Sequence, residues 1–294
     1  MKILLLGANG MLGQSIYKEF AKDTSIQLFT VARNDAIYKF DLLDDANLRE
    51  CFDAVQPDVC INSAAIVNLS LCEGDRLLAY NTNARLCSML TEVCSRYRTY
   101  YIQISTDHYY SGDGRKKHDE QAAITLYNEY AKTKYAGEKF AELYDKSLIL
   151  RTNIVGFRGV ISRPTFLEWA IENILSRKSM TLFNDFYTSS ISTNLFANIL
   201  RDVIKNQLLG VYNLASDTVS SKEEFIVSLS KALFDCIPVY DAGSLDGLCG
   251  VKRANSLGLD VSGIESALGY TMPDLERVLY SLKAEYKEGK GCGV

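Results

Sequence analysis

Histidine, paired cysteine motifs, long apolar runs and excess positive charge are scarce or absent in this sequence of 294 residues. Two histidines and no Cys-x-x-Cys pair supply too few clustered ligands for a structural zinc site, so we expect no metal. A formal net charge of -4 offers no basic field to nucleic acid or anionic lipid. No apolar run reaches the roughly 18 residues of a membrane span. We therefore expect neither a nucleic-acid nor a membrane partner.

The composition indicates a folded protein that acts on a small soluble molecule. Its length and its 47% of hydrophobic residues suffice for one large domain and a smaller lobe. The apolar start at Ile3 to Leu6 is too short for a signal peptide, so the expected location is the cytoplasm. Most cysteines fall in apolar helix or strand patterns and are predicted to be reduced core residues. The cysteines are Cys51, Cys60, Cys72, Cys87, Cys94, Cys236, Cys249 and Cys292.

Short apolar runs alternate with helical patterns in the first half of the chain. This alternation is typical of a parallel sheet with helices on both faces. We therefore predict an α/β fold with a Rossmann-type doubly wound parallel sheet over residues 1–152. The predicted strands are 2–6, 26–32, 58–62, 99–105 and 147–151, and the predicted helices are 11–22, 45–54, 75–97 and 126–144.

Beyond residue 152 the pattern loosens and predicts a smaller mixed lobe that binds the substrate. Residues 189–204 have helical periodicity, and we expect the stretch of about 187–212 to return to the dinucleotide-binding domain and complete it. Residues 153–186 and 213–294 are assigned to the substrate-binding lobe. Its predicted elements are helices over 166–177, 222–234 and 274–287 and a strand over 211–215.

A glycine-rich turn joins the first predicted strand to the first predicted helix. Gly7 permits a sharp turn, Gly10 permits close approach of the backbone to a pyrophosphate, and Gly13 permits close packing of the helix on the sheet. The free N–H groups of the helix N-terminus then favour phosphate. An ordinary strand-to-helix turn also uses glycine, and that alternative stays open. The residues predicted to contact the cofactor here are Gly7, Asn9, Gly10, Met11, Leu12 and Gly13.

Two further segments bear on the same predicted dinucleotide site. The second strand ends at Arg33, without the acidic residue that binds a ribose 2′-hydroxyl, which favours NADPH over NADH through a 2′-phosphate. An ordinary surface arginine is the alternative. The small side chains of Ala64 and Ala65, after the strand over 58–62, leave room for the dinucleotide.

Tyr130 and Lys134 lie four residues apart on a predicted helix and therefore share one face. A free tyrosine has a pKa near 10, and a neighbouring ammonium favours its phenolate, which makes it a better proton shuttle. Tyr-x-x-x-Lys alone is common on helix surfaces. Upstream, however, the strand over 99–105 leads to Thr106 at the sheet edge where ligands bind, and Thr106 is placed to hydrogen-bond a carbonyl. A hydroxyl that merely caps the next turn is the competing interpretation.

The order and spacing of these motifs resemble the extended short-chain dehydrogenases/reductases, and most closely the family of dTDP-4-dehydrorhamnose reductase and related sugar-nucleotide reductases. The resemblance rests on Ser105-Thr106-Asp107, Asn128 to Glu138, Arg151-Thr152, Gly210 to Ala215 and Arg253 to Asp260. It implies Thr106, Tyr130 and Lys134 as the catalytic set. It also implies cofactor contacts at Tyr130, Lys134, Asp41 and Leu42, and substrate contacts at Thr106, Asp107, His108 and Arg253.

The chain departs from the family pattern at several expected substrate positions. His108 replaces a tyrosine, Ile154 and Gly156 replace a tryptophan and a tyrosine, and Ala254 replaces a proline. His108 is either a substrate contact or an ordinary turn histidine. The cofactor and catalytic motifs persist, so the chemistry is better supported than the identity of the sugar.

Three functions are compatible with the sequence. The first is an NAD(P)H-dependent reductase of a nucleotide-linked keto-deoxysugar, in which Tyr130 supplies the proton. The second is a sugar-nucleotide epimerase or dehydratase with tightly bound NAD(P), and the third is a non-catalytic NADP-binding regulatory subunit. A homodimer is the expected assembly because dimers are the commonest soluble oligomers.

Overall fold

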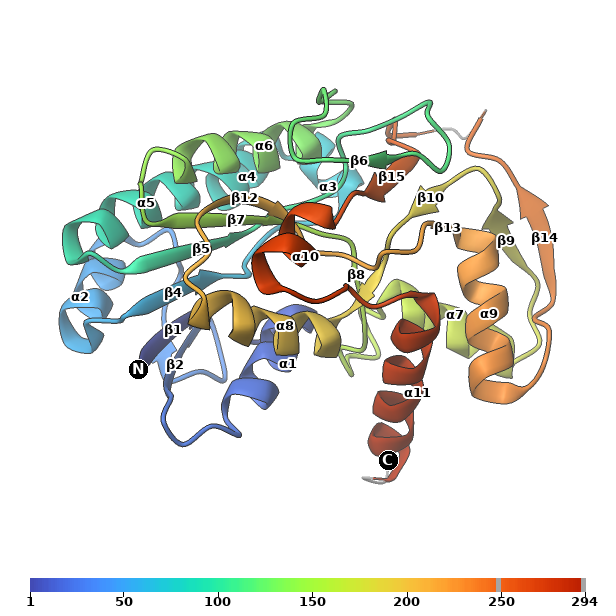
Figure 1. The fold of residues 1–294 in the computed structure, drawn as a ribbon, viewed down its shortest axis with the longest axis horizontal. Helices are drawn as coiled ribbons and strands as arrows, with labels where there is room; N and C mark the ends of the chain where they lie inside the picture. Colours follow the sequence, from blue (N-terminus) through green and yellow to red (C-terminus); the bar gives the residue numbers. More distant parts are fainter. Residues whose placement is uncertain (247–249, 292–294) are drawn as a thin grey trace.

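The computed structural model describes residues 1–246 and 250–291 and shows a large α/β unit beside a smaller lobe (Figure 1). The large unit contains a seven-stranded parallel sheet in the order β12-β7-β5-β4-β1-β2-β3, which confirms the predicted Rossmann-type fold. Because the order reverses between β1 and β4, a ligand crevice is expected at the carboxyl ends of these strands. The strands are β1 (Lys2–Leu6), β2 (Gln27–Ala32), β3 (Tyr38–Lys39), β4 (Val59–Asn62), β5 (Tyr100–Ile104), β7 (Ser147–Arg151) and β12 (Gly210–Asn213).

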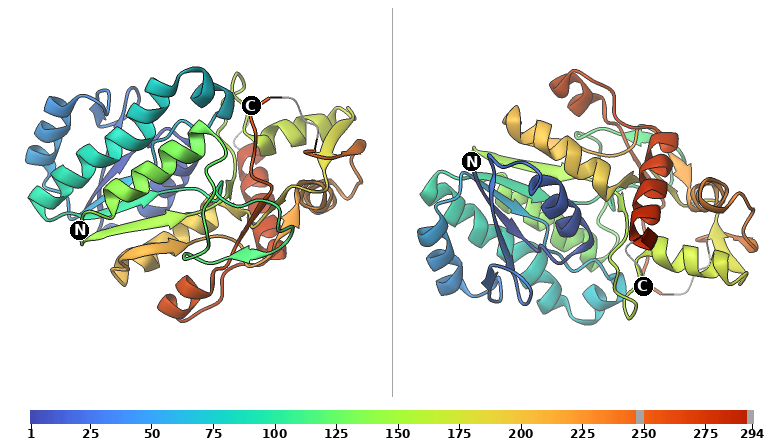
Figure 2. Two further views of the ribbon diagram at one scale, coloured as in Figure 1. Left: turned by 90° about the horizontal axis from the view of Figure 1, so that it is seen from above. Right: turned by 90° about the horizontal axis from the view of Figure 1, so that it is seen from below.

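Helices cover both faces of this sheet (Figure 2). Side chains of β1 alternate between the two faces, with Ile3 and Leu5 in the core beneath α1 and α8 and Leu4 and Leu6 in the core beneath α2 and α5. Both faces are therefore apolar, as expected for a buried parallel sheet. The helices are α1 (Met11–Phe20) and α8 (Thr193–Lys205) on one face, and α2 (Asp45–Val55), α5 (Leu86–Tyr97) and α6 (Glu129–Ala141) on the other.

The helix predicted over 75–97 forms over 76–97, but it contains a π-helical turn that the sequence did not predict. The chain forms α4 (Arg76–Tyr80), a π-helical turn η1 (Asn81–Arg85) and then α5, after a separate α3 (Leu69–Gly74). The wide turn carries Asn83, whose side chain accepts a hydrogen bond from the Ile66 amide at 2.9 Å and donates to the Ile66 carbonyl at 3.0 Å. Gly137 of α6 packs against this turn, and a Cβ there would lie 2.4 Å from the Asn83 carbonyl oxygen. Tertiary contacts thus determine the local helix geometry.

The smaller lobe contains short strands and three helices of the second half. A four-stranded sheet runs in the order β13-β10-β15-β6, and two-stranded sheets pair β11 with β8 and β14 with β9. The sequence did not predict these strands, most of which have two residues. The strands are β6 (Lys117–His118), β8 (Ile154–Val155), β9 (Met180–Phe183), β10 (Tyr187–Thr188), β11 (Ile191–Ser192), β13 (Ser220–Ser221), β14 (Tyr240–Gly243) and β15 (Ser256–Leu259). The helices are α7 (Phe166–Leu175), α9 (Lys222–Phe234) and α11 (Leu275–Gly291), with α10 (Ser262–Leu268) between the lobe and the sheet.

The two parts of the molecule are closely joined. Leu259, Val261 and Ile264 belong to the same hydrophobic core as β1 and α8, so part of the 213–294 stretch packs on the large unit. Helix α11 lies between α8 and α9 (Figure 1). The two parts therefore form a continuous framework.

The cysteines in the described residues are all free thiols. Five of them are buried and Cys236 is exposed, whereas Cys249 and Cys292 lie outside the described residues. Across the described ranges, no helix combines the length and the apolar character needed to cross a bilayer.

Candidate active site

The glycine turn after β1 has the shape of a phosphate cradle. Gly7 has a φ of +78°, and a Cβ at this position would lie 2.8 Å from the Ala64 amide nitrogen. A Cβ at Gly13 would lie 2.2 Å from the Gly7 carbonyl oxygen, so both positions require glycine. Helix α1 begins after Gly10 without a side-chain cap, which leaves its first N–H groups available to an anion. These features fit a dinucleotide pyrophosphate.

The surroundings of the turn have room for the rest of such a ligand. Asn9 donates a hydrogen bond to the Asn34 carbonyl at 2.5 Å and thereby ties the turn to the segment after β2. A cavity of about 430 Å³ lies there, lined in part by Asn9 and Thr30. Ala64 and Ala65 follow β4 at the same sheet edge.

The other predicted cofactor contacts lie on exposed loops. Arg33 follows β2, and Asp41 follows β3 and accepts a hydrogen bond from the Leu43 amide at 3.0 Å. Leu42 packs against the core beneath α2.

Thr106, Tyr130 and Lys134 converge next to this edge. Thr106 follows the carboxyl end of β5, the neighbour of β4 in the sheet, and is 3% exposed. Tyr130 is buried against Ile66, directly after the Ala64-Ala65 pair. The Thr106 hydroxyl lies close enough to the phenol of Tyr130 to lower its pKa. The sequence prediction that these residues gather at one place therefore agrees with their observed positions.

Helix α6 fixes the positions of Tyr130 and Lys134. Asn128 caps the helix by accepting a hydrogen bond from the Ala131 amide at 2.9 Å, and it donates to the Lys252 carbonyl at 2.9 Å. Lys134 donates from Nζ to the Ile104 carbonyl at 2.6 Å, which anchors its ammonium at the end of β5. Asn128 thus starts helix α6 and ties it to the segment that contains Arg253.

Electrostatics favour the neutral phenol. Burial raises the pKa of Tyr130 well above its ordinary value, the Thr106 hydrogen bond lowers it, and the charge of Asp107 raises it further. The expectation that Lys134 lowers this pKa differs from what is seen, because the charge of Lys134 acts on Cys87 and Glu138. Burial lowers the pKa of Lys134 itself. The phenol of Tyr130 is therefore protonated at neutral pH.

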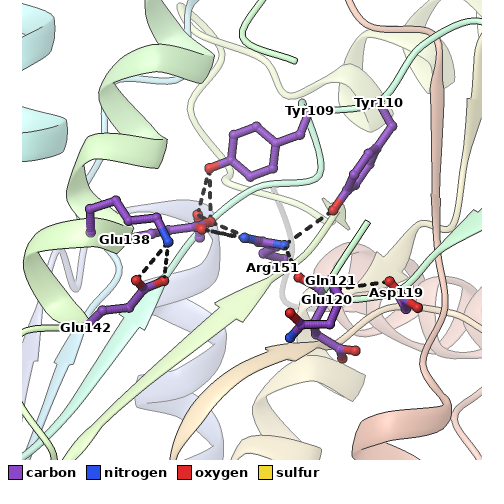
Figure 3. Close-up of polar contacts among 10 residues, drawn as sticks. Tyr109, Tyr110, Asp119, Glu120, Gln121, Glu138, Glu142 and Arg151 are labelled. Carbon is purple, nitrogen blue, oxygen red and sulfur yellow. Dashed lines mark hydrogen bonds and ion pairs between the residues drawn. The ribbon is translucent and has the colours of Figure 1, made fainter. Parts of the chain in front are cut away.

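A buried ion pair joins helix α6 to the end of β7 (Figure 3). Glu138 of α6 and Arg151 at the end of β7 are 0% and 3% exposed, and Arg151 Nη2 lies 2.8 Å from Glu138 Oε2. Tyr109 donates a hydrogen bond to Glu138 at 2.9 Å, and Arg151 donates to the hydroxyl of Tyr110 at 3.3 Å. This cluster joins α6 to β7 and to the segment after β5, and therefore holds in place the helix and the strand end that carry Tyr130, Lys134 and Thr106.

Asp107 and His108 lie between the catalytic residues and the smaller lobe. The His108 ring contacts Tyr130 edge to face, with centroids 5.4 Å apart, and its Nε2 lies 3.9 Å from Asp107 Oδ1. Burial, together with the charges of Lys222 and Arg253, lowers the pKa of His108 to about 4, so the ring is neutral at pH 7. Its Nδ1 is buried without a hydrogen-bond partner among the described residues.

Sequence analysis missed two residues on the lobe side, Asn153 and Lys222. Asn153 donates to Asp107 at 2.7 Å, and Lys222 Nζ stacks 5.1 Å from the centroid of Phe166 and 5.5 Å from that of Phe186. A signal for Lys222 exists, because the Ser221-x-x-Glu224 capping box sets it at the first position of α9. Nothing in its local sequence indicates that it faces a remote crevice.

A Tyr-x-x-x-Lys helix beside a glycine turn on a Rossmann sheet places this chain in the class of extended short-chain dehydrogenases/reductases. The chain belongs to the family described as the RmlD substrate binding domain, whose model matches residues 1–235.

Known proteins similar to the chain match it over nearly its whole length. A dTDP-4-dehydrorhamnose reductase of Aggregatibacter actinomycetemcomitans is 25% identical over 96% of this chain and 98% of the relative. A probable low-salt glycan biosynthesis reductase, Agl14, of Haloferax volcanii is 23% identical over 98% of this chain and 99% of the relative. The structure of dTDP-4-dehydrorhamnose reductase from Bacillus anthracis in complex with NADP has the same fold, with a TM-score of 0.85, 22% identity and coverage of 97% of this chain and 99% of that one.

Proposed function

We propose that this chain is an NAD(P)H-dependent reductase of a nucleotide-linked keto-deoxysugar. The observation that carries the proposal is the meeting of Thr106 and the buried, protonated Tyr130 at the strand ends beside the glycine cradle. The names of the reductases that match the chain over almost its full length support the substrate class.

The residues have distinct roles in the proposed reaction. When bound, the cofactor supplies a hydride to the ketone carbon of the sugar. Thr106 orients the ketone oxygen, and Tyr130 donates its phenolic proton to the alkoxide that forms there. Lys134, anchored on the Ile104 carbonyl, would hold the ribose hydroxyls of the cofactor. Asp107, His108 and Arg253 bind the sugar nucleotide from the opposite side.

The glycine cradle and Arg33 favour NADPH as the cofactor. The residues that would hold it are Gly7, Asn9, Gly10, Met11, Leu12, Gly13, Arg33, Asp41, Leu42, Ala64 and Ala65. An exposed guanidinium after β2 is suited to a 2′-phosphate, and NADH remains a substrate of lower affinity.

Turnover by the isolated chain tests the proposal. Purified protein is incubated with NADPH and a panel of 4-keto-6-deoxysugar nucleotides, while the absorbance of the reduced nicotinamide is followed. We expect one NADPH to be consumed for each reduced sugar. Epimerised or dehydrated product without net NADPH consumption would instead support the epimerase or dehydratase alternative, and tight NADP binding without any turnover would support a regulatory subunit.

We also propose that the enzyme works in the cytoplasm as a homodimer. The free thiols suit a reducing compartment, and twofold dimers are the commonest soluble assembly. Sedimentation equilibrium of the purified chain tests the assembly.

A further inference from the structure

A chain of hydrogen bonds connects the smaller lobe to the catalytic strand end. Lys222 Nζ lies 3.4 Å from Thr188 Oγ1, and Thr188 Oγ1 lies 3.0 Å from Ser190 Oγ. Ser190 then donates to Asn153 Oδ1 at 2.7 Å, and Asn153 Nδ2 donates to Asp107 Oδ2 at 2.7 Å. The links join residues 34, 2, 37 and 46 positions apart in the sequence.

The donors and acceptors in this series of hydrogen bonds can be arranged in only one direction. An ammonium can only donate and a carboxylate can only accept, which fixes the two ends. Ser190 has a single hydroxyl proton, and it is used on Asn153, so Thr188 must donate to Ser190 and accept from Lys222. Every donor therefore points from the cation towards the carboxylate. Bonds polarised in one direction strengthen one another in a region of low dielectric constant.

Most side chains in this series of hydrogen bonds are buried, so they are shielded from water. Thr188 is 0% exposed, Ser190 is 3% exposed and Asp107 is 1% exposed. A carboxylate at such a depth is costly unless it is hydrogen-bonded and compensated by a positive charge. Among the described residues, no carboxylate oxygen forms an ion pair with Lys222, whose side chain instead ends at Thr188 between two aromatic rings.

At its Asp107 end, the series of hydrogen bonds reaches the residues proposed to react. Thr106 donates from Oγ1 to Asp107 Oδ1 at 3.4 Å and accepts a hydrogen bond from the His108 amide at 3.3 Å. Its hydroxyl lies beside Tyr130 and affects the pKa of that phenol. The Asp107 carboxyl, which accepts this hydrogen bond, therefore sets the orientation of the Thr106 hydroxyl beside Tyr130.

We propose that Lys222 is a positioning residue, whose ammonium acts through Thr188, Ser190 and Asn153 to hold Asp107 ionised and thereby to orient Thr106. This proposal rests on the proposed reductase function. Burial raises the pKa of Asp107 to about 7 although Asn153 and Lys222 lower it, so the support from these two residues decides how far the carboxyl is ionised at neutral pH. The charges of Lys222 and Arg253 both lower the pKa of the neighbouring His108.

A double-mutant cycle separates this role from direct substrate binding. Lys222→Met removes the ammonium. Thr188→Val interrupts the series of hydrogen bonds while Lys222 stays in place. We expect each change to lower kcat about tenfold, with the KM for the sugar and the Kd for NADPH within about twofold of the wild type. The double variant should be no less active than either single variant, because both changes interrupt the same series of hydrogen bonds. Additive losses, or a raised KM with normal kcat in Lys222→Met alone, would overturn the proposal.

Matched variants control for packing. Thr188→Ser retains the hydroxyl and should restore near-normal kcat, whereas loss of activity in Thr188→Ser would contradict the proposed hydrogen-bond role. Lys231→Met changes an exposed lysine on the same helix α9 and should leave kcat unchanged. Thermal denaturation of each variant identifies any change caused by unfolding.

A measurement on the free protein makes the test independent of turnover. The carboxyl carbon of Asp107, assigned with Asp107→Asn, is titrated by NMR. Lys222→Met and Thr188→Val should both raise the pKa of Asp107, because each removes support for the ionised form. An unchanged pKa would refute the network. The expected shifts in a protein that reduces no sugar nucleotide would leave the network standing while the reductase proposal fails.

Discussion

The two sides of the crevice are built in different ways. On the sheet side, Thr106, Tyr130 and Lys134 come from one strand end and one helix, and Ile104 and Asn128 in those same elements fix them. On the lobe side, the links between Asp107, Asn153 and Lys222 join segments 34 to 46 residues apart. The reacting groups thus come from two adjacent elements of the large unit, whereas their surroundings are assembled from several short segments.

The largest expected effect tests the sheet side. Tyr130→Phe removes only the phenolic oxygen, because the ring still packs against Ile66 and Cys72. We expect kcat to fall about a thousandfold, since the proton donor is lost, with little change in the Kd for NADPH. Steady-state kinetics and a fluorescence titration of NADPH provide the two values. Turnover close to that of the wild type would remove Tyr130 from the mechanism.

Removal of the Arg151–Glu138 ion pair tests how much this buried charge pair stabilises the sheet side of the site. Arg151→Met leaves the fully buried carboxylate of Glu138 without its cation, and we expect a loss of about 3 kcal/mol in the free energy of unfolding. Urea denaturation at pH 7 measures this loss. As a control, the double variant Glu138→Leu with Arg151→Met removes both charges and should recover most of the stability. Equal losses in the single and double variants would show that packing, not charge, dominates.

The same contrast explains how much was predictable from sequence. The alternation of strands and helices, the glycine turn and the Tyr130–Lys134 spacing are local patterns, and each predicted its element correctly. The π-helical turn at Asn83 is in contact with Ile66 and Gly137, which lie outside the helix, and the sequence predicted the helix but not this turn. Two-residue strands such as β10 carry too few residues for a periodic signal. The role of Lys222 depends on three intermediate side chains, which no local pattern reveals.

A smaller effect is expected at Arg33, where a local pattern alone predicts a cofactor contact. Arg33→Ser removes an exposed guanidinium after β2. If this group binds the 2′-phosphate, the KM for NADPH should rise about tenfold, while the KM for NADH stays within about twofold. Parallel kinetics with both cofactors provide the comparison. An equal change for the two cofactors would reassign Arg33 to the ordinary protein surface.

The smallest effect concerns Glu285 of α11, at the junction of the two parts. Its Oε2 is buried without a hydrogen-bond partner among the described residues, and burial raises its pKa to about 7, with Lys18 lowering this pKa and Glu288 and Glu168 raising it. Because the folded state binds this proton more tightly than the unfolded state, stability falls as the pH rises from about 4.5 to about 7. The full cost of the charge is present above that window.

Glu285→Gln should therefore stabilise the protein at pH 8 and have little effect at pH 4, where the carboxyl is neutral in both states. Allowing for partial exposure, we expect a gain on the order of 1 kcal/mol at pH 8, measured by chemical denaturation at both pH values. Glu288→Gln is the matched control, because Glu288 is exposed, pairs with Lys18 at 2.8 Å and has a lowered pKa, so its removal should bring no gain. A gain at pH 8 that persists at pH 4 would mean that amide packing stabilises the junction, and burial of charge at the boundary between the lobes would then have no measurable cost.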